Sequence, residues 1–286
     1  MTWVKICSKM SSRLKFVVIL LTLFSWPFNL YLANTKGNFI NYLIPLLLLC
    51  LSFLLYKKGQ GLFLFPALVI PLVQPKLALF PLLLVLFLWP FVKRNKLYYL
   101  NLVLSFFVLL FVLLPFKGQT IFTPDYEARQ AVLRKINLYP NPFLARVFQN
   151  KGRIYLDKFS QNLFALSDPN NYFFRFHPRE IIISNQNLEK YPFLAIFFLF
   201  FGIFSLKKSP NKNFIVASFT AGLLSLSFLT IFDRNDFILW LPISLTIIAG
   251  INQLSSKRNK YVYGFLTIYI LFALIQFVRN YMTFSL

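Results

Sequence analysis

Residues 117–190 read KGQTIFTPDYEARQAVLRKINLYPNPFLARVFQNKGRIYLDKFSQNLFALSDPNNYFFRFHPREIIISNQNLEK, the only long polar segment in an otherwise apolar chain. Five hydrophobic runs precede this segment and four follow it. The segment therefore reads as one large loop between two groups of membrane helices. We expect any chemistry of the chain at the place where this loop meets the membrane surface.

The composition supports the membrane class. Hydrophobic residues make up 58% of the 286 residues and charged residues 13%, whereas a soluble protein carries roughly 25% charged residues. A net charge of +22 can indicate nucleic acid binding, but half of the 30 basic residues lie in short clusters between apolar runs. That placement follows the positive-inside rule and argues against nucleic acid as a partner. Neither Cys7 nor Cys50 has the spacing of a metal site.

The apolar runs predict nine membrane segments, since a spanning helix needs about 20 apolar residues. The first run, 16–33, lacks a clean small-residue cleavage site, so we interpret it as an uncleaved anchor. Segment 61–92 is too long for one helix and is broken by prolines. It predicts a short helix pair that turns at Gln74-Pro75-Lys76 and either crosses twice or dips in and returns. The other predicted segments are 39–56, 97–116, 191–206, 213–232, 237–252 and 261–278.

Basic residues set the predicted orientation. Predicted inside loops hold two to four each, and predicted short outside loops hold one each. We therefore expect a protein of the cell membrane. This asymmetry predicts that its N-terminus is cytoplasmic and that the loop at 117–190 is extracytoplasmic. The predicted fold is thus an all-α integral membrane protein with a mostly helical loop domain. Its parts are a five-segment bundle (1–116), the loop domain (117–190) and a four-segment bundle (191–286).

The loop has its own helix signals. Thr123-Pro124-Asp125 predicts a helix start, with a cap, a proline and an acid in the first turn. Asn141-Pro142 predicts a second short helix that ends at Gly152, and a third helix is expected from about Arg153 to Leu166. Their mixture of aromatic and basic residues suits a domain that lies on lipid headgroups.

Eight acids and one histidine limit the possible chemistry. Asp157, beside Arg153 and Lys158, is interpreted as one half of a surface ion pair. Asp233 and Asp236 flank Arg234: two carboxylates three residues apart can bind a divalent cation, but a solvated turn neutralised by Arg234 is favoured. No glycine-rich phosphate loop, nucleophile elbow or zinc motif is present.

The densest cationic cluster is Arg175-Phe176-His177-Pro178-Arg179. Arginine binds phosphate through a planar fork of donors, and histidine transfers protons near neutral pH. The cluster therefore suits a lipid-linked phosphate, and Lys76 can meet the same phosphate at the outer interface. The alternatives are loop residues that pair with Asp168, Glu180 or anionic lipid, and a snorkelling Lys76.

Residues 154–180, IYLDKFSQNLFALSDPNNYFFRFHPRE, together with the following YPFLAIFFLFFGIF, resemble the outer-loop signature of bacterial GT-C membrane glycosyltransferases of the protein-mannosyltransferase and aminoarabinose-transferase type. Segment 61–88 is similar to the short broken helix pair of that family, with Pro75-Lys76 at the turn. Residues 233–251 are similar to a late family segment, with Arg234 ahead of Pro242. The matching loop positions are Tyr155, Phe159, Ser160, Phe164, Asp168, Pro169, Asn170, His177 and Pro178.

The resemblance also implies a difference. Family members carry a catalytic aspartate in the first outer loop, whereas this chain has Asn34-Thr35-Lys36-Gly37-Asn38 there. The long loop follows the fifth segment instead of the seventh. We therefore interpret the chain as a family member without the first helix pair and the acidic catalytic loop, in the form of a shortened, split or degenerate copy.

The resemblance implies transfer of a sugar from a polyprenyl-phosphate carrier to an extracytoplasmic acceptor. His177 is then the catalytic residue, and no metal or other cofactor is expected. A partner subunit can supply the missing acidic loop. Open alternatives are an O-antigen-ligase-like enzyme that uses His177, and a non-catalytic carrier-binding or assembly subunit; transport is weaker. The predicted substrate-binding residues are Lys76, Asp168, Arg175, Arg179 and Arg234.

Overall fold

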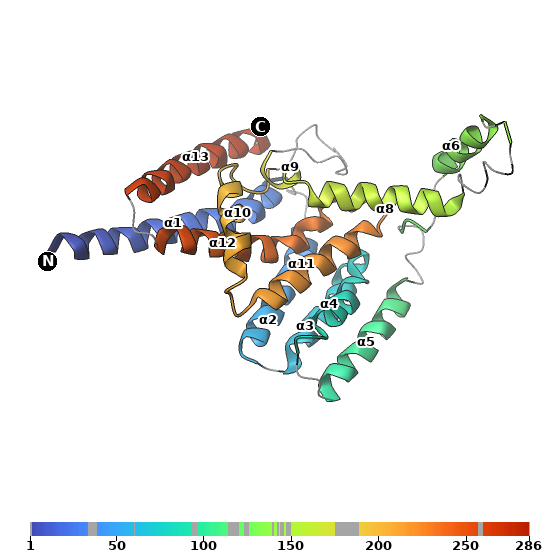
Figure 1. Cartoon of the computed structure of the whole chain (residues 1–286), viewed down its shortest axis with the longest axis horizontal. Helices are drawn as coiled ribbons and strands as arrows, with labels where there is room; N and C mark the ends of the chain where they lie inside the picture. The colour runs from blue at the N-terminus through green and yellow to red at the C-terminus, as the bar shows by residue number, and fades with distance from the viewer. Residues whose placement is uncertain are drawn as a thin grey trace.

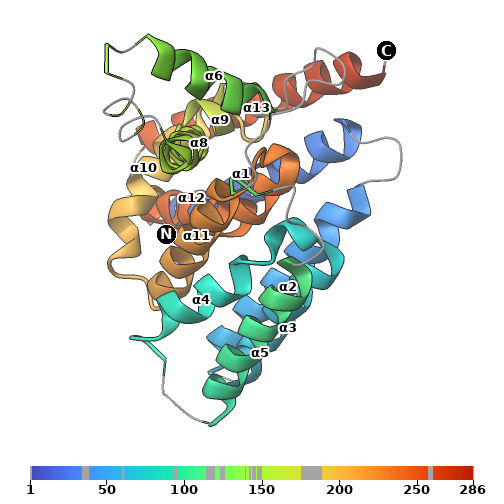
Figure 2. The same ribbon diagram turned by 90° about the vertical axis from the view of Figure 1, so that its right-hand side faces the viewer.

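A computed structural model describes residues 2–33, 39–59, 61–92, 96–113, 120–122, 126–138, 140–141, 143, 146, 150–174, 189–256 and 260–285. These residues are mostly helical, and the β-pairing found among them is an isolated bridge between Thr120 and Leu229. Figures 1 and 2 show the arrangement of the helices in two views. The helices are α1 (Thr2–Ala33), α2 (Phe39–Lys57), η1 (Gly61–Leu64), α3 (Phe65–Val73), η2 (Pro75–Leu77), α4 (Phe80–Leu88), α5 (Lys96–Leu113), α6 (Tyr126–Asn137), α8 (Lys151–Ser167), α9 (Asn170–Phe173), α10 (Ala195–Leu206), α11 (Lys212–Ser227), η4 (Asp233–Leu239), α12 (Trp240–Ser256) and α13 (Lys260–Ser285).

Helix length and apolarity support an all-α membrane protein. Within the described residues, four stretches are long and apolar enough to cross a bilayer: Arg13–Ala33, Phe39–Lys57, Asp233–Ser256 and Tyr261–Thr283. Shorter apolar helices cover Leu62–Val73, Pro75–Leu88, Lys96–Val112 and Ala195–Leu206. The nine-segment topology stays a prediction, because the remaining helices are shorter than a full span.

One face of α5 illustrates the apolar exterior. Leu100, Val103, Phe107 and Phe111 follow one another at helical spacing, and each side chain is at least 51% exposed. A contiguous exposed apolar stripe of this kind is unfavourable in water and favourable against lipid. The exposed aromatic and aliphatic side chains therefore support the membrane class that the composition predicts.

The predicted break of the 61–92 segment is confirmed at Gln74. Its backbone leaves the helical region (φ −128°, ψ 87°) between the end of α3 at Val73 and the start of η2 at Pro75. A proline disfavours helical backbone in the residue before it, which explains why the chain turns here. The Gln74 N–H still donates to the Ile70 carbonyl at 2.9 Å, so the end of α3 is capped.

Helices α10 and α12 cross each other (Figure 1). One glycine of each helix lies at the crossing. A Cβ at Gly250 would lie 1.9 Å from the Phe198 carbonyl oxygen, and a Cβ at Gly202 would lie 2.0 Å from the Thr246 carbonyl oxygen. Small residues allow two backbones to approach this closely in membrane helix pairs. The crossing holds in place the segment before α10, which carries the site described below.

The described part of the loop packs on the helices that follow it. The Asn162 side chain of α8 donates to the Leu229 carbonyl at 2.6 Å, beyond the end of α11. Phe159 lies against Phe228 with ring centroids 5.0 Å apart. Figure 2 shows α2, α3, α4 and α5 as a group of neighbouring helices, with α4 next to α11. One hydrophobic core runs through all of these parts, from Val18 to Ala273.

Three loop predictions have clear outcomes. Helix α6 begins at Tyr126, directly after the predicted start signal, whose own residues lie outside the described part. Gly152 does not end a helix: it lies in the first turn of α8, because the Asn150 side chain caps that helix by accepting from the Arg153 N–H at 3.0 Å. The surface ion pair is confirmed, with 3.0 Å between Arg153 Nε and Asp157 Oδ1.

Candidate functional site

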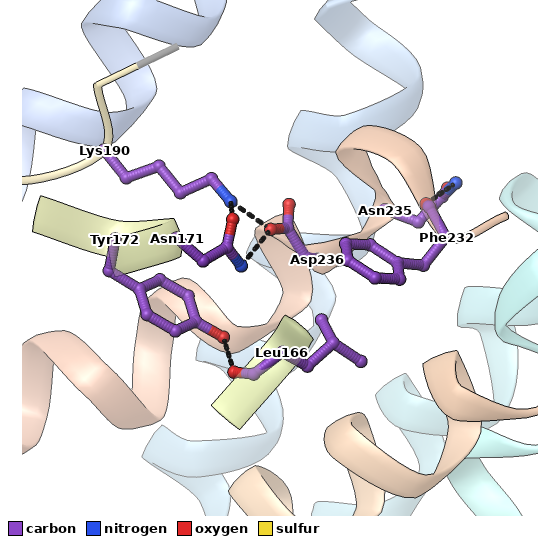
Figure 3. A network of polar contacts seen from close by, with 7 residues as sticks. All are labelled: Leu166, Asn171, Tyr172, Lys190, Phe232, Asn235 and Asp236. Atoms are coloured by element: carbon purple, nitrogen blue, oxygen red, sulfur yellow. Dashed lines mark hydrogen bonds and ion pairs between the residues drawn. The ribbon is translucent and has the colours of Figure 1, made fainter. Parts of the chain in front are cut away.

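A buried polar cluster joins the end of the loop to the C-terminal helices. The ammonium of Lys190 pairs with the carboxylate of Asp236, and each side chain is only 1% exposed. Lys190 Nζ also donates to Asn171 Oδ1 at 2.7 Å, and Asn171 Nδ2 lies 3.4 Å from Asp236 Oδ2. Figure 3 shows these three side chains pointing toward one another from α9, η4 and the stretch before α10.

Aromatic rings surround the ammonium of this cluster. Lys190 Nζ lies 5.1 Å from the ring centroid of Trp26 and 5.2 Å from that of Tyr172. Trp26 in turn makes edge contacts with Tyr172, Tyr191 and Phe237 at centroid distances of 5.5 to 5.8 Å. Cation–π attraction is stronger where water is excluded, so the rings add to the ion pair. The cluster ties α1 to three segments that are distant in sequence.

Tyr172 contributes a hydroxyl as well as a ring. Burial raises the pKa of its phenol well above the ordinary range, and the nearby Asp236 carboxylate raises this pKa further. The phenol therefore stays protonated and donates to the Leu166 carbonyl at 2.6 Å (Figure 3). This bond fixes α9 against the end of α8.

The residue before Lys190 makes a second ion pair in another direction. Glu189 pairs with Arg279 of α13 and accepts a hydrogen bond from Gln276. Its backbone carbonyl accepts from Asn29 Nδ2 at 2.7 Å. Adjacent residues thus fasten the chain to α1, η4 and α13. The Glu189 side chain is 8% exposed and that of Arg279 is 52% exposed, so the second pair reaches the surface.

A backbone hydrogen bond joins the described residues on either side of the predicted cationic segment. The Tyr191 N–H donates to the Tyr172 carbonyl at 2.9 Å. Residues 175–188 lie outside the described residues, and so do the predicted catalytic His177 and the predicted phosphate ligands Arg175 and Arg179. The described residues on the two sides of this segment are held together by the bond between Tyr191 and Tyr172.

Two other predicted ligands lie on turns that meet each other. Gln74 Nε2 donates to Asn235 Oδ1, which joins the turn that carries Lys76 to the turn that carries Arg234. Arg234 Nη1 donates to the Ala33 carbonyl at the end of α1, at 3.2 Å. Lys76 is half-buried, and within the described ranges no side chain pairs with its ammonium. The turns with Lys76 and Arg234 therefore meet beside the Lys190 cluster.

Asp168, the last predicted ligand, has a local structural contact. Its Oδ1 accepts from the Asn170 N–H at 2.9 Å, which stabilises the turn that starts α9. This turn presents Asn171 to Lys190. Asp168 therefore stands at the start of α9, the last described helix before segment 175–188.

The favoured interpretation of Asp233 and Asp236 as a solvated turn is wrong for Asp236. That side chain is buried and paired with Lys190, 46 residues away in sequence, because η4 packs against α2, α11 and α12 instead of facing water. Within the part of the chain that the structure describes, no group of three or more His, Cys, Asp or Glu side chains is placed to hold a metal ion.

Sequence reasoning missed Lys190, Asn171 and Trp26. A weak signal was present: Glu189 and Lys190 stand together directly before an apolar run, and Asp236 stands at the start of another. Acids and bases beside membrane segments need partners. The sequence does not indicate which basic residue pairs with which acidic residue, because the partners come from elements distant in sequence.

Two ion pairs hold charged side chains of the described site. Lys190 and Asp236 neutralise each other, as do Glu189 and Arg279. Both buried acids and Lys190 are therefore engaged in ion pairs within the protein. Within the described ranges, no acidic side chain pairs with the ammonium of Lys76, and Arg234 donates to the Ala33 carbonyl.

Comparisons with protein-family models, with curated proteins and with solved structures found no match for this chain.

Proposed function

We propose that this chain is a nine-segment membrane protein that binds a polyprenyl-phosphate-linked sugar at its extracytoplasmic end and transfers the sugar to an acceptor. The single observation behind the proposal is the meeting of three elements. The turn with Lys76, the turn with Arg234 and the described residues that flank segment 175–188 meet around the Lys190–Asp236 pair. Three cation-bearing segments at one end of a helix bundle suit a phosphate.

The predicted topology agrees with these contacts. Arg234 to Ala33, Gln74 to Asn235 and Lys190 to Asp236 each join two segments that the positive-inside rule assigns to the outer side. The predicted inner clusters lie at the other ends of the same helices, such as Lys57 at the end of α2. A mixed set of contacts between predicted inner and outer loops would have argued against the assignment.

In the proposed reaction, Arg175 and Arg179 hold the carrier phosphate with help from Lys76 and Arg234. His177 removes the proton from the acceptor hydroxyl, whose oxygen forms the new bond to the anomeric carbon. The bond from that carbon to the phosphate oxygen breaks, and the phosphate leaves with the electron pair. Arginines stabilise the negative charge that grows on the leaving oxygen.

A second candidate is a non-catalytic subunit that binds the carrier for a partner enzyme. The specific observation in its favour is that both buried acids of the site are engaged, Asp236 by Lys190 and Glu189 by Arg279. The first outer loop, 34–38, contains no acid either. A partner subunit would then supply the acidic loop, and His177 would have no catalytic role.

Turnover and binding distinguish the two candidates. The full chain is purified in detergent, and sugar release from a polyprenyl-phosphate sugar is followed together with carrier binding. The Arg175→Ala change is expected to weaken carrier binding by roughly tenfold or more, because a hydrogen bond to a charged group is lost. The His177→Ala change is expected to lower kcat by roughly a hundredfold with binding unchanged.

The matched control is Arg134→Ala on α6, an exposed arginine of the same loop away from the meeting point. It is expected to behave as the wild type does. Binding without turnover in the wild type selects the second candidate. No carrier binding, or equal losses in Arg134→Ala and Arg175→Ala, refutes both.

A further inference from the structure

A separate cavity of about 420 Å³ lies between α4, α10 and α11, at the end of α10 that is far from Lys190. Apolar side chains form most of it, among them Phe87, Phe91, Ile203 and Val216. Phe91, Ile203 and Val216 are more than half exposed, so this apolar surface is open at the side of the bundle. Its volume falls within the range of roughly 300–1,000 Å³ typical of small-molecule sites.

Two exposed lysines complete the lining of this cavity. Lys207 follows the end of α10 and Lys212 begins α11, with one tight turn between them. Across the described ranges, neither ammonium pairs with an acidic side chain. The first turn of α11 also opens here without a side-chain cap at Asn211, so its N–H groups add positive potential. The cavity thus combines an apolar wall with an unneutralised pair of cations.

We propose that this cavity binds an anionic phospholipid of the cytoplasmic leaflet. An acyl chain would lie along Phe87, Ile203 and Val216, and the phosphate would lie between Lys207 and Lys212. The charge and the open apolar wall together select this occupant, since basic pockets between membrane helices on the cytoplasmic side bind acidic headgroups. The inference goes beyond sugar transfer: it depends on the membrane assignment and its orientation, and it holds with or without catalysis.

Native mass spectrometry of the full chain in detergent tests the proposal, with phosphatidylglycerol or phosphatidylcholine of identical acyl chains added. The wild type is expected to retain phosphatidylglycerol preferentially. The double variant Lys207→Gln/Lys212→Gln is expected to bind it roughly twenty-five-fold more weakly, because each basic residue near an anionic surface contributes about a fivefold factor. The matched control, Lys57→Gln/Lys58→Gln, changes an exposed basic pair on the same predicted side that does not line the cavity.

A second variant separates the cavity from general surface charge. Val216→Trp fills the apolar wall and keeps both lysines, and it is expected to weaken phosphatidylglycerol retention as well. Retention that is equal for the two lipids would overturn the proposal. An equal loss of retention in the Lys57→Gln/Lys58→Gln control would also overturn it. So would retention of inorganic phosphate alone that equals the retention of phosphatidylglycerol.

Discussion

Replacing Lys190 with methionine is expected to destabilise the protein by about 3–5 kcal/mol. The change removes the cation that neutralises Asp236 in a site where both side chains are 1% exposed. It also removes the donor to Asn171 Oδ1 and the charge that faces Trp26 and Tyr172. Methionine has a similar length, so the loss comes from the charge and not from a cavity. Thermal unfolding of the purified chain in detergent measures the effect.

Two controls make this result specific. Arg153→Met breaks the exposed pair with Asp157 on α8 and is expected to cost at most about 1 kcal/mol. Lys190→Met combined with Asp236→Leu removes both charges and is expected to recover much of the loss, because no uncompensated carboxylate is left. If Lys190→Met unfolds at the same temperature as Arg153→Met, the pair does not hold the site together.

Replacing Gly250 with alanine is expected to destabilise the protein by about 3 kcal/mol or more. The added methyl group would lie 1.9 Å from the Phe198 carbonyl oxygen and 2.8 Å from the Gly202 backbone nitrogen. Backbone atoms of a helix cannot move aside as a flexible side chain can, so α10 and α12 must separate. The unfolding temperature and the yield of folded protein measure the effect.

Gly264→Ala on α13 is the matched control. Nothing lies within 4 Å of a Cβ added there, and alanine favours a helix over glycine by roughly 0.5–1 kcal/mol. This variant is expected to be as stable as the wild type or slightly more stable. Equal losses in Gly250→Ala and Gly264→Ala would show that close approach of α10 and α12 is not what limits stability.

The helices were predictable from sequence because their causes are local. Apolar runs of spanning length predicted α1, α2 and α13, a slightly shorter run extended by its flanks predicted α12, and the proline at position 75 predicted the break at Gln74. The Arg153–Asp157 pair followed from helical spacing alone. Gly152 was misread because glycine is compatible with both a helix end and a first helical turn, and the cap at Asn150 decided between them.

The centre of the candidate site was not predictable, because its causes are not local. Asp236 was interpreted as part of a solvated turn from its neighbour Arg234, but Arg234 donates to the Ala33 carbonyl and Lys190 pairs with Asp236. Burial of Asp236 depends on the packing of η4 against α2, α11 and α12 and on the contacts of Asp236 with Lys190 and Asn171. No pattern within η4 itself contains that information.

Sidedness is the central claim, and thiol labelling in intact cells tests it most directly. In a chain with Cys7 and Cys50 replaced by serine, Ser184→Cys places a thiol in the segment between Phe174 and Glu189. Ser209→Cys places one in the α10–α11 turn. A membrane-impermeant maleimide is predicted to label the Ser184→Cys chain in intact cells, and the Ser209→Cys chain only after the membrane is permeabilised. The reverse pattern, with the Ser184→Cys chain protected until permeabilisation, would contradict the account.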